Sequence, residues 1–488
     1  MSDITMEKKT GKVDLKHYIN ILITVLFMFG FRYIPAPEPL TPYGMAILGI
    51  FIGVIYGWST SSTGLMWVSL LAVFAVGFTD FGNVTEATVK MFSADTALLL
   101  LLGMFLAGPI QKANLGEWMV TKILTLKIIE GHPWRFVAVI LFGTGIIGFL
   151  SNGFVVALVM VAILNDLYEK AGYKIGDSLP IMLTIGMFIS LMSFSTIFPF
   201  KGWGLYCVSA FKGAVGTGLD YGKYVIVAIC FYLILSFGYM LLMKVIRCDV
   251  SKIQNIDLSD YKKKYENGLT LYQKVAMGLF LFWVLGCMAV TFLAKVAGIG
   301  QFLTLAGVMG ITLITIILYM TIKVDEKPIV TPTECNKFFM WDMVFVVATG
   351  MFLASLLTGE GTGVSAWVAQ TVGPLLQGHS EFVFLLLMGI LALILTNFLN
   401  NVAIMFIFMA VVGTMASQGL IQNVETAGMV VALSTIIGFY TPASSAYGAM
   451  IHGSDWCPSG LVYKYGLAVF IYLFVVLAIL IFIANIVF

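Results

Sequence analysis

Charged side chains are scarce in this sequence of 488 residues, because Asp, Glu, Lys and Arg supply only 11% of it, against roughly 25% in soluble domains. The formal net charge is +2 and no basic tract exists beyond Lys262–Lys264, so nothing points to nucleic acid as a partner. The 6 cysteines and 4 histidines show no metal or redox spacing. Motifs typical of serine hydrolases, zinc proteases and nucleotide-binding loops are also missing. These absences argue against an enzyme, an ATP-driven pump and an organic cofactor.

Apolar residues are abundant instead. Hydrophobic residues make up 60% of the chain, and its mean hydropathy is +0.99. We therefore predict an all-α polytopic membrane protein with about 11 transmembrane helices and two re-entrant hairpins, at 135–168 and 381–417. The polar segment 1–17 is followed by the first apolar run without a small-residue cleavage site, so we expect that run to be retained as a helix.

The distribution of basic residues predicts the orientation in the membrane. Eleven crossings place the two termini on opposite sides. With the N-terminus in the cytoplasm, 21 of the 27 Lys and Arg residues fall on the cytoplasmic side, which is the asymmetry that the positive-inside rule describes. We expect a cytoplasmic-membrane protein with its N-terminus inside and its C-terminus outside. The first hairpin then enters from the cytoplasm and the second from outside.

The two predicted hairpins carry similar polar tips. Residues 149–152 read Phe-Leu-Ser-Asn, and residues 398–401 read Phe-Leu-Asn-Asn. The apolar runs on either side are short for a bilayer span of about 20 residues. Backbone that stops being helical at membrane depth is tolerated only where it is buried in protein or lines a cavity. A polar tip repeated in two halves therefore predicts a binding site between two structural repeats.

A second duplication supports this division. Asp95 is followed eight residues later by Gly-Met-Phe-Leu-Ala at 103–107, and Asp342 is followed at the same distance by the same five residues at 350–354. An odd number of crossings separates the two copies, so we predict inverted repeats. The expected order is a cytoplasmic segment 1–17, scaffold helices 18–80, the first repeat 81–246, a cytoplasmic linker 247–269, scaffold helices 270–322 and the second repeat 323–488.

Each repeat is expected to close with a helix that breaks inside the membrane, at 180–211 and at 426–452. Pro199 and Pro442 each remove a backbone donor and clash with the preceding turn, although a lone proline could merely kink a continuous helix. A broken helix offers free N–H groups to an anion and free carbonyl groups to a small cation. An asparagine at a hairpin tip could touch sodium with its oxygen and a carboxylate with its nitrogen, or it could only cap a hairpin helix.

These motifs resemble the divalent anion/sodium symporter family within the wider ion transporter superfamily. That family carries Ser-Asn-Thr at each hairpin tip, and the copies here read Ser151-Asn152-Gly153 and Asn400-Asn401-Val402. The resemblance implies a homodimer whose scaffold holds an elevator-like transport domain, with a small carboxylate or oxyanion as substrate. The candidate substrate-binding residues are Ser151, Asn152, Gly153, Lys201, Asn400, Asn401, Thr441, Pro442 and Ser444.

Departures from the family pattern bear on the coupling ion. In relatives that use sodium, each cation site includes a hydroxyl four residues before the signature, a position held by Thr396 in the second copy and by Ile147 in the first. We therefore expect at most one sodium site, at Thr396, Asn400 and Asn401. Lys201 is the one cation predicted within a span, where a charge costs at least about 2.5–3.5 kcal/mol. Its ammonium could snorkel to the membrane face, replace the first sodium, or meet the anion directly.

Two transporter functions remain open at this point. The leading hypothesis is a secondary carrier for a small anion, most simply a di- or tricarboxylate, working by cation-coupled symport or by anion exchange. The alternative is a sodium/proton antiporter of the same superfamily, in which Asp95 or Asp342 would titrate. Both aspartates open apolar helices, so helix capping is the simpler interpretation. A channel is disfavoured because two hairpins entering from opposite sides would block a continuous pore.

Overall fold

The structure is a computed structural model that describes residues 15–61, 63–93, 95–254, 268–294, 296–337, 339, 341–359, 361–376, 380–442 and 444–488. Residues 1–14 of the predicted N-terminal segment and residues 255–267 of the predicted linker lie outside this part of the chain. Within it nearly every element is a helix. A two-stranded hairpin, in which β1 (Lys323–Val324) pairs antiparallel with β2 (Lys327–Pro328), is the exception among the described residues. The predicted all-α polytopic membrane fold is thereby confirmed.

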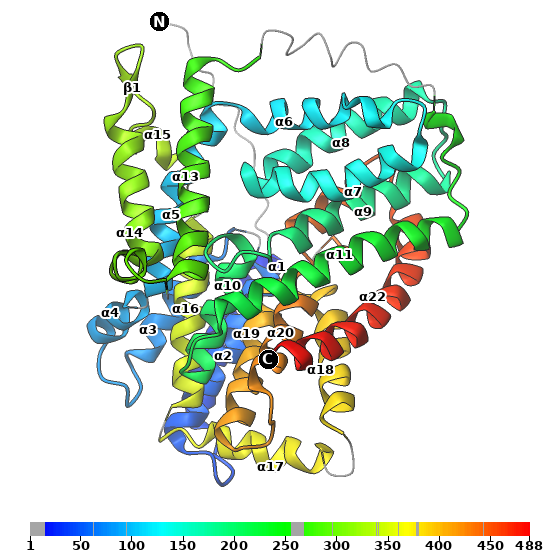
Figure 1. Cartoon of the computed structure of the whole chain (residues 1–488). Coiled ribbons are helices and arrows are strands. Elements are labelled where there is room, and N and C mark those ends of the chain that lie inside the picture. The colour runs from blue at the N-terminus through cyan, green and yellow to red at the C-terminus, as the bar shows by residue number, and fades with distance from the viewer. Residues whose placement is uncertain are drawn as a thin grey trace, which may run out of the picture.

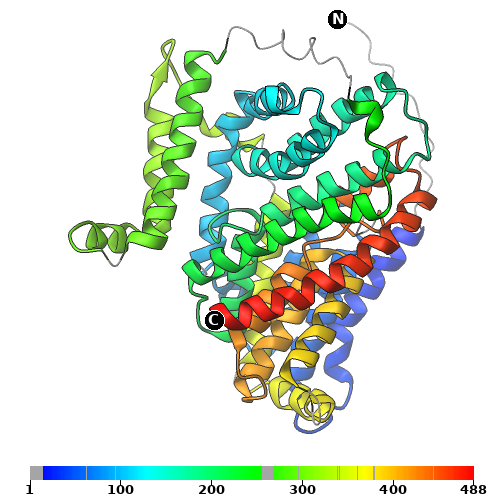
Figure 2. The same cartoon turned by 45° about the vertical axis from the view of Figure 1, so that its right-hand side comes forward.

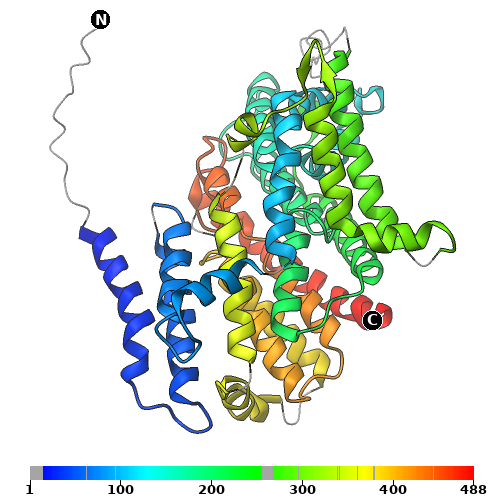
Figure 3. The same cartoon turned by 90° about the vertical axis from the view of Figure 1, so that its left-hand side faces the viewer.

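The first part of the chain begins with a helix at the outer edge of the molecule, α1 (Leu15–Gly30) (Figure 3). Helix α1 packs along α2 at its edge (Figure 3), and α3 packs on both α2 and α4. The bent pair α4–α5 turns by 55° at its junction. These elements are α1 (Leu15–Gly30), α2 (Pro42–Thr60), α3 (Met66–Val76), α4 (Val84–Phe92), α5 (Asp95–Lys112) and α6 (Leu115–Leu124).

Two helix pairs occupy the ranges predicted for the hairpins. The first pair is α7 (Pro133–Leu150) and α8 (Gly153–Lys170), and the second is α18 (Glu381–Thr396) and α19 (Asn401–Ser417). The first pair lies toward one end of the molecule and the second toward the opposite end (Figure 1, Figure 2). Helix α6 lies beside the first pair, and α17 (Val364–Leu376) lies at the far end with the second.

Two helices are interrupted where prolines predicted a break. Helix α9 (Ser178–Phe194) is separated from α10 (Gly202–Val215) by a stretch containing Pro199. Helix α20 (Val424–Ser434) is separated from α21 (Ala446–His452) by a longer stretch containing Pro442. Each is followed by a long apolar helix, α11 (Tyr221–Val245) or α22 (Ser459–Val487), and these two helices pack together across the molecule (Figure 1).

A pair of helices stands apart from the main body, as Figure 2 shows. It consists of α13 (Leu271–Leu293) and α14 (Ile299–Thr321), which contact the rest chiefly through α5. Helix α14 bends at Gly307, whose φ of +58° is a conformation that glycine adopts readily. The chain then continues through α15 (Pro332–Asn336) to α16 (Trp341–Thr358), which is buried along most of its length.

By length and composition, eight described helices could each cross a membrane, or up to nine if α4 and α5 form one bent span. The eight include α7, which we predicted to be one arm of a re-entrant hairpin. The broken helices add pieces that are individually too short for this criterion. The number of crossings, expected to be eleven, therefore stays a prediction.

The second half of each broken helix packs against helices from the other half of the chain. Helix α10 lies on α19 and α16, and α21 lies on α9 beside the first hairpin. The approach of α10 to α19 is close, because a Cβ on Gly413 would come within 2.3 Å of the Ala214 carbonyl oxygen. The Trp203 indole N–H also donates to the Ala432 carbonyl at 3.0 Å, which ties α10 to α20. This crossed packing connects segments more than 200 residues apart in the sequence.

Asp342 lies in the first turn of α16 but caps the start of another helix. Its carboxylate accepts hydrogen bonds from the backbone N–H groups of Leu65 at 2.9 Å and Met66 at 2.7 Å, and so caps the start of α3. The capping role expected of this aspartate is therefore correct in kind but applies to a different helix. The side chain of Asp95 lies outside the described part of the chain.

Candidate functional site

The tip of the first hairpin is a two-residue turn between α7 and α8. Asn152 caps α8, since its Oδ1 accepts hydrogen bonds from the N–H groups of Phe154 at 2.9 Å and Val155 at 3.3 Å. The Ser151 hydroxyl donates to the Ile147 carbonyl at 2.9 Å. The capping interpretation of Asn152 is thus realised, and its amide nitrogen remains available beside the tip.

Lys201 reaches this tip from the first broken helix. Its ammonium donates a short hydrogen bond to the Phe149 carbonyl and a second, at 3.4 Å, to the Ser151 carbonyl. It also lies over the Phe149 ring at 4.8 Å and the Phe280 ring at 4.5 Å. The carbonyl groups belong to the C-terminal end of α7, which carries the negative end of the helix dipole. The ammonium therefore occupies a position that a small cation would favour, and it points inward rather than snorkelling.

The second hairpin has the same type of cap, but one residue earlier than the pairing of the two tips in the sequence predicts. Asn400 caps α19, because its Oδ1 accepts from the N–H groups of Val402 at 3.0 Å and Ala403 at 3.3 Å. Asn152 therefore corresponds to Asn400, and Gly153 corresponds to Asn401. Asn401 is partly buried, and its side chain makes no hydrogen bond to any residue that the structure describes.

Asn397 joins the second hairpin to the second broken helix. Its amide nitrogen donates to the carbonyls of Leu393 and Ile437, each at 2.8 Å. Its Oδ1 accepts from the N–H groups of Phe439 and Tyr440, each at 2.9 Å. The side chain is fully buried and uses both of its amide hydrogens and its carbonyl oxygen. It holds the tip and the break at a fixed separation.

The break between α20 and α21 is organised by hydroxyl groups. The Thr441 hydroxyl donates to the Asn397 carbonyl at 2.7 Å, and the Ser444 hydroxyl donates back to the Thr441 carbonyl at 2.7 Å. Ser445 caps α21 by accepting from the Gly448 N–H at 2.9 Å. Pro442, also predicted at the site, is exposed. Thr441 therefore lies directly against the end of the second hairpin.

The donor set around Thr396 suits sodium. Thr396 is fully buried, and its hydroxyl donates to the Thr435 carbonyl at 2.7 Å, which leaves its lone pairs free. The Thr396 carbonyl lies close to Gly438 in the break, where an added Cβ would be 3.2 Å from it. These oxygens are the hard, neutral ligands that a hard cation prefers. The Asn400 oxygen, by contrast, is already occupied by its helix cap.

In the first hairpin no matching side-chain oxygen exists at this level. Ile147 and, in the register that the caps define, Gly148 carry none. The place beside the α7 carbonyl groups is instead held by the Lys201 ammonium. The two halves are therefore chemically different: the Lys201 side-chain nitrogen lies at the first tip, and neutral oxygens lie beside the second.

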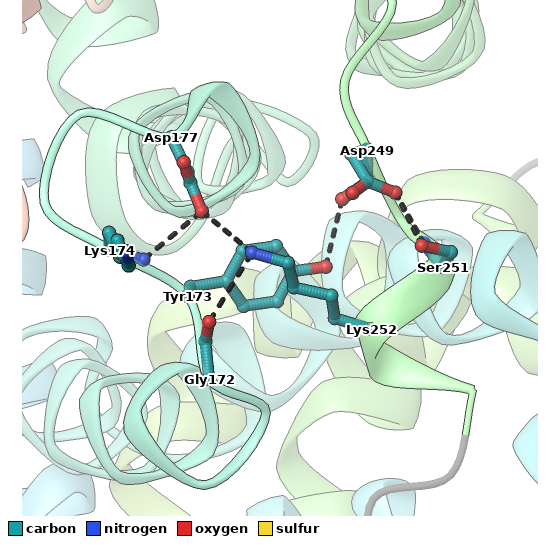
Figure 4. Close-up of polar contacts among 7 residues, drawn as sticks. All are labelled: Gly172, Tyr173, Lys174, Asp177, Asp249, Ser251 and Lys252. Carbon is teal, nitrogen blue, oxygen red and sulfur yellow. Dashed lines mark hydrogen bonds and ion pairs between the residues drawn. The ribbon is translucent and has the colours of Figure 1, made fainter.

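A polar cluster fixes the base of the first hairpin, away from the tips (Figure 4). Lys252 pairs with Asp177 at 3.1 Å, donates to the Gly172 carbonyl at 3.3 Å, and lies over the Tyr173 ring. The Tyr173 hydroxyl donates to the Asp249 carbonyl at 2.8 Å. Hydrogen bonds from the Lys174 backbone N–H and, to a smaller extent, from the Lys252 ammonium hold the pKa of Asp177 below its usual value. Burial raises the pKa of Tyr173 and keeps its phenol protonated. The cluster ties the α8–α9 loop to the segment after α11.

The sequence did not single out two residues that the structure places at the site. Asn397 lies three residues before the predicted pair, in the stretch Thr-Asn-Phe-Leu-Asn-Asn, where a third polar residue was the available signal. Tyr447 lies in the first turn of α21, and a Cβ on Gly153 would come within 2.6 Å of its hydroxyl oxygen. No local pattern marked this tyrosine, because its relation to the first hairpin arises only from packing.

Helical hairpins with polar tips, each facing an interrupted helix, define this chain as a polytopic membrane protein built like a secondary transporter. Residues 46–438 match the citrate transporter family, and the chain belongs to that family, in agreement with the predicted ion transporter superfamily. It is 21% identical over 438 residues to the sodium-dependent dicarboxylate transporter SdcS of Staphylococcus saprophyticus, covering 84% of this chain and 80% of that protein.

The fold is also similar to that of a solved structure. The MtrF protein of Neisseria gonorrhoeae, described as illuminating a class of antimetabolite efflux pumps, superposes with a TM-score of 0.58 over 96% of this chain and 94% of that chain. The sequence identity is 12%, so this likeness supports the fold alone. The family membership and the dicarboxylate transporter relative indicate a transporter rather than an enzyme.

Proposed function

We propose that the protein is a secondary active transporter that moves a small di- or tricarboxylate across the cytoplasmic membrane. The observation that carries this proposal is the pairing of each hairpin tip with an interrupted helix, completed by a cation, Lys201, placed on the carbonyl end of α7. Such a site offers positive charge, amide donors and hydroxyl groups to a carboxylate. The citrate family and the dicarboxylate relative support the same class of substrate.

The two tips would form one site near the middle of the membrane. The second broken helix supports this arrangement, since Thr441 contacts the second tip while Tyr447, six residues later, contacts the first. The hairpins lie toward opposite ends of the molecule, as two inverted repeats would place them (Figure 1). We further propose that the hairpins and broken helices move as an elevator-like transport domain within a homodimer.

The coupling of transport to sodium would differ between the two hairpin tips. The Lys201 ammonium would replace a first sodium, and the oxygens around Thr396 would hold at most one sodium ion, which would supply positive charge beside the second tip. The empty carrier would keep the Lys201 charge in its site. Transport would then require fewer coupled cations than in a carrier with two sodium sites, or would proceed by anion exchange. In this proposal the N-terminus is cytoplasmic and the C-terminus is outside.

The antiporter alternative gains nothing from the geometry of Asp342. Its carboxylate serves as a helix cap for α3, where protonation would remove two hydrogen bonds from backbone N–H groups. A carboxylate that titrates during transport would be expected to face a cation rather than a helix N-terminus. We therefore favour the carboxylate carrier.

The test is a ligand panel on the purified full chain. Thermal unfolding would be measured with succinate, malate, citrate and sulfate, each in sodium and in choline buffer, because a ligand that binds only the folded state stabilises it. Uptake of the stabilising carboxylate into proteoliposomes would follow. We expect a di- or tricarboxylate to raise the unfolding temperature and to be transported. Cation-for-proton exchange without any carboxylate effect would overturn the proposal in favour of an antiporter.

A further inference from the structure

The two hairpin tips differ at the residue that follows the capping asparagine. In the second tip this residue is Asn401, whose half-buried side chain has no hydrogen-bond partner among the described residues. In the first tip it is Gly153, which has no side chain. If both tips bind one anionic substrate, the first tip lacks a polar side chain at this position.

Tyr447 supplies a polar group at that place from another part of the chain. A Cβ built on Gly153 would come within 2.6 Å of the Tyr447 hydroxyl oxygen, so only a residue without a side chain allows this approach. The same Cβ would be 3.9 Å from the ring carbon that carries the hydroxyl, which is ordinary van der Waals contact. The hydroxyl, rather than the ring, is what occupies the space beside the tip.

Two contacts of its helix and its ring hold this hydroxyl in place. Tyr447 lies in the first turn of α21, whose start is fixed by the Ser445 cap. Its ring packs against the Phe188 ring of α9, with centroids 5.7 Å apart. The hydroxyl itself makes no hydrogen bond to any residue that the structure describes. A phenol donor held rigidly beside a binding site, without a protein partner, is available to a ligand.

We propose that the Tyr447 hydroxyl donates a hydrogen bond to a carboxylate of the substrate at the first hairpin tip, in the position where the second tip uses the Asn401 side chain. This inference rests on the proposed function and specifies how the first tip recognises its ligand. The first half of the site would then combine one charge, from Lys201, with one neutral donor, from Tyr447. A neutral donor adds directional recognition without further desolvation of a charge.

The alternative is that Tyr447 acts only through packing. In that case its ring against Phe188 would carry the whole effect, and removal of the hydroxyl would change nothing in ligand binding. Tyr447→Phe keeps the ring and removes only the hydroxyl, so it separates the two roles. Tyr319→Phe is the matched control, because the Tyr319 hydroxyl donates to the Ala276 carbonyl at 2.9 Å within the α13–α14 pair, away from the tips.

The experiment measures the dissociation constant of succinate and of citrate by calorimetry on the purified full-length protein. We expect Tyr447→Phe to weaken both about tenfold or more, since a hydrogen bond to a charged acceptor is lost, while the unfolding temperature without ligand stays at the wild-type value. Tyr319→Phe should leave both dissociation constants unchanged. If Tyr447→Phe weakens the affinity for succinate as much as the affinity for citrate, the acceptor is a carboxylate, because succinate has no hydroxyl group.

A second pair of variants keeps the test decisive if Tyr447→Phe alone folds poorly. In a protein that keeps Tyr447, Gly153→Ala should weaken carboxylate binding strongly, because the new Cβ would displace the Tyr447 hydroxyl. In the Tyr447→Phe background the same substitution should have little additional effect. Gly153→Thr combined with Tyr447→Phe offers a hydroxyl from the tip itself and should recover part of the lost affinity.

Failure of the proposed function and failure of the Tyr447 role give different results. If the wild-type protein binds neither succinate nor citrate nor any other carboxylate in the panel, the proposed function fails. If the wild-type protein binds a carboxylate and Tyr447→Phe binds it with the same dissociation constant, the role of the hydroxyl is refuted while the proposed function stands. Independent, additive effects of Gly153→Ala and Tyr447→Phe would also refute it.

Discussion

The charge on Lys201 is the feature whose removal should have the most informative consequences. Lys201→Ala deletes the ammonium and leaves room beside the Phe149 and Ser151 carbonyl groups, whereas Lys201→Met deletes the charge but fills much of the same space. Lys201→Arg retains a positive charge. Comparing these three variants separates the effect of charge from the effect of volume.

The magnitude follows from the contacts of the ammonium. It makes two hydrogen bonds to carbonyl groups and lies over two aromatic rings, with the ring centroids at 4.8 and 4.5 Å. A buried acceptor left without a partner costs about 1–3 kcal/mol, and a desolvated cation–π contact contributes up to about 2 kcal/mol. The cost of desolvating the ammonium offsets part of this sum. We expect Lys201→Met to lose about 2–4 kcal/mol of folding free energy.

Sodium should compensate only where there is room for it. In Lys201→Ala a sodium ion could bind the vacated carbonyl oxygens, and at a concentration of 100 times its dissociation constant it would restore about 2.7 kcal/mol. Thermal unfolding in sodium and in choline buffer measures this difference directly. Carboxylate uptake should either be lost in Lys201→Ala or acquire a new requirement for sodium, and Lys201→Met should not acquire one.

A surface lysine provides the control. Lys464 is exposed and lies over the Tyr465 ring at 5.5 Å, so Lys464→Ala should change neither stability nor cation dependence. If Lys201→Ala transports at the wild-type rate with unchanged cation dependence, the ammonium is not part of the site and the reasoning is refuted.

Three further predictions address the second hairpin and the base of the first. Thr396→Val should weaken the sodium dependence of carboxylate uptake while Ile147→Ser leaves it unchanged; bound sodium at both hairpins would contradict this. Asn397→Leu should lower the free energy of unfolding by about 3 kcal/mol or more, because four buried or partly buried backbone groups lose their partner. An unchanged unfolding temperature would refute the role of Asn397 in holding α18 to the break. The pKa of Asp177 lies below its ordinary value of 3.8, so its pairing stabilises the fold above that pH and is lost as the pH falls through the lower, folded-state pKa. Asp177→Asn should therefore be less stable than the wild type at pH 7, by no more than about 1 kcal/mol because the pair with Lys252 is partly exposed. The difference should shrink as the pH falls below 3.8.

The sequence by itself determined the class of protein and its family. Long apolar runs specify membrane helices wherever they occur, because burial of apolar surface is additive along a segment. Interruptions of those runs are equally local signals: a polar pair at a tip and a proline in a helix change backbone hydrogen bonding at their own position. For this reason the hairpin and break ranges, such as 381–417 and 180–211, could be stated without a structure.

Only the tertiary structure decided which atoms meet at the site. Lys201 could be seen to lie in a span, but its contact with the Phe149 carbonyl depends on how α7 packs against the first break. The helix cap is at Asn400 rather than Asn401, because a run of similar polar residues leaves open where the helix starts. The hydrogen bonds of Asn397 to the second break likewise depend on how α18 packs there. The meeting of Tyr447 with Gly153 joins segments almost 300 residues apart. Contacts of this kind arise from three-dimensional packing, which no local pattern encodes.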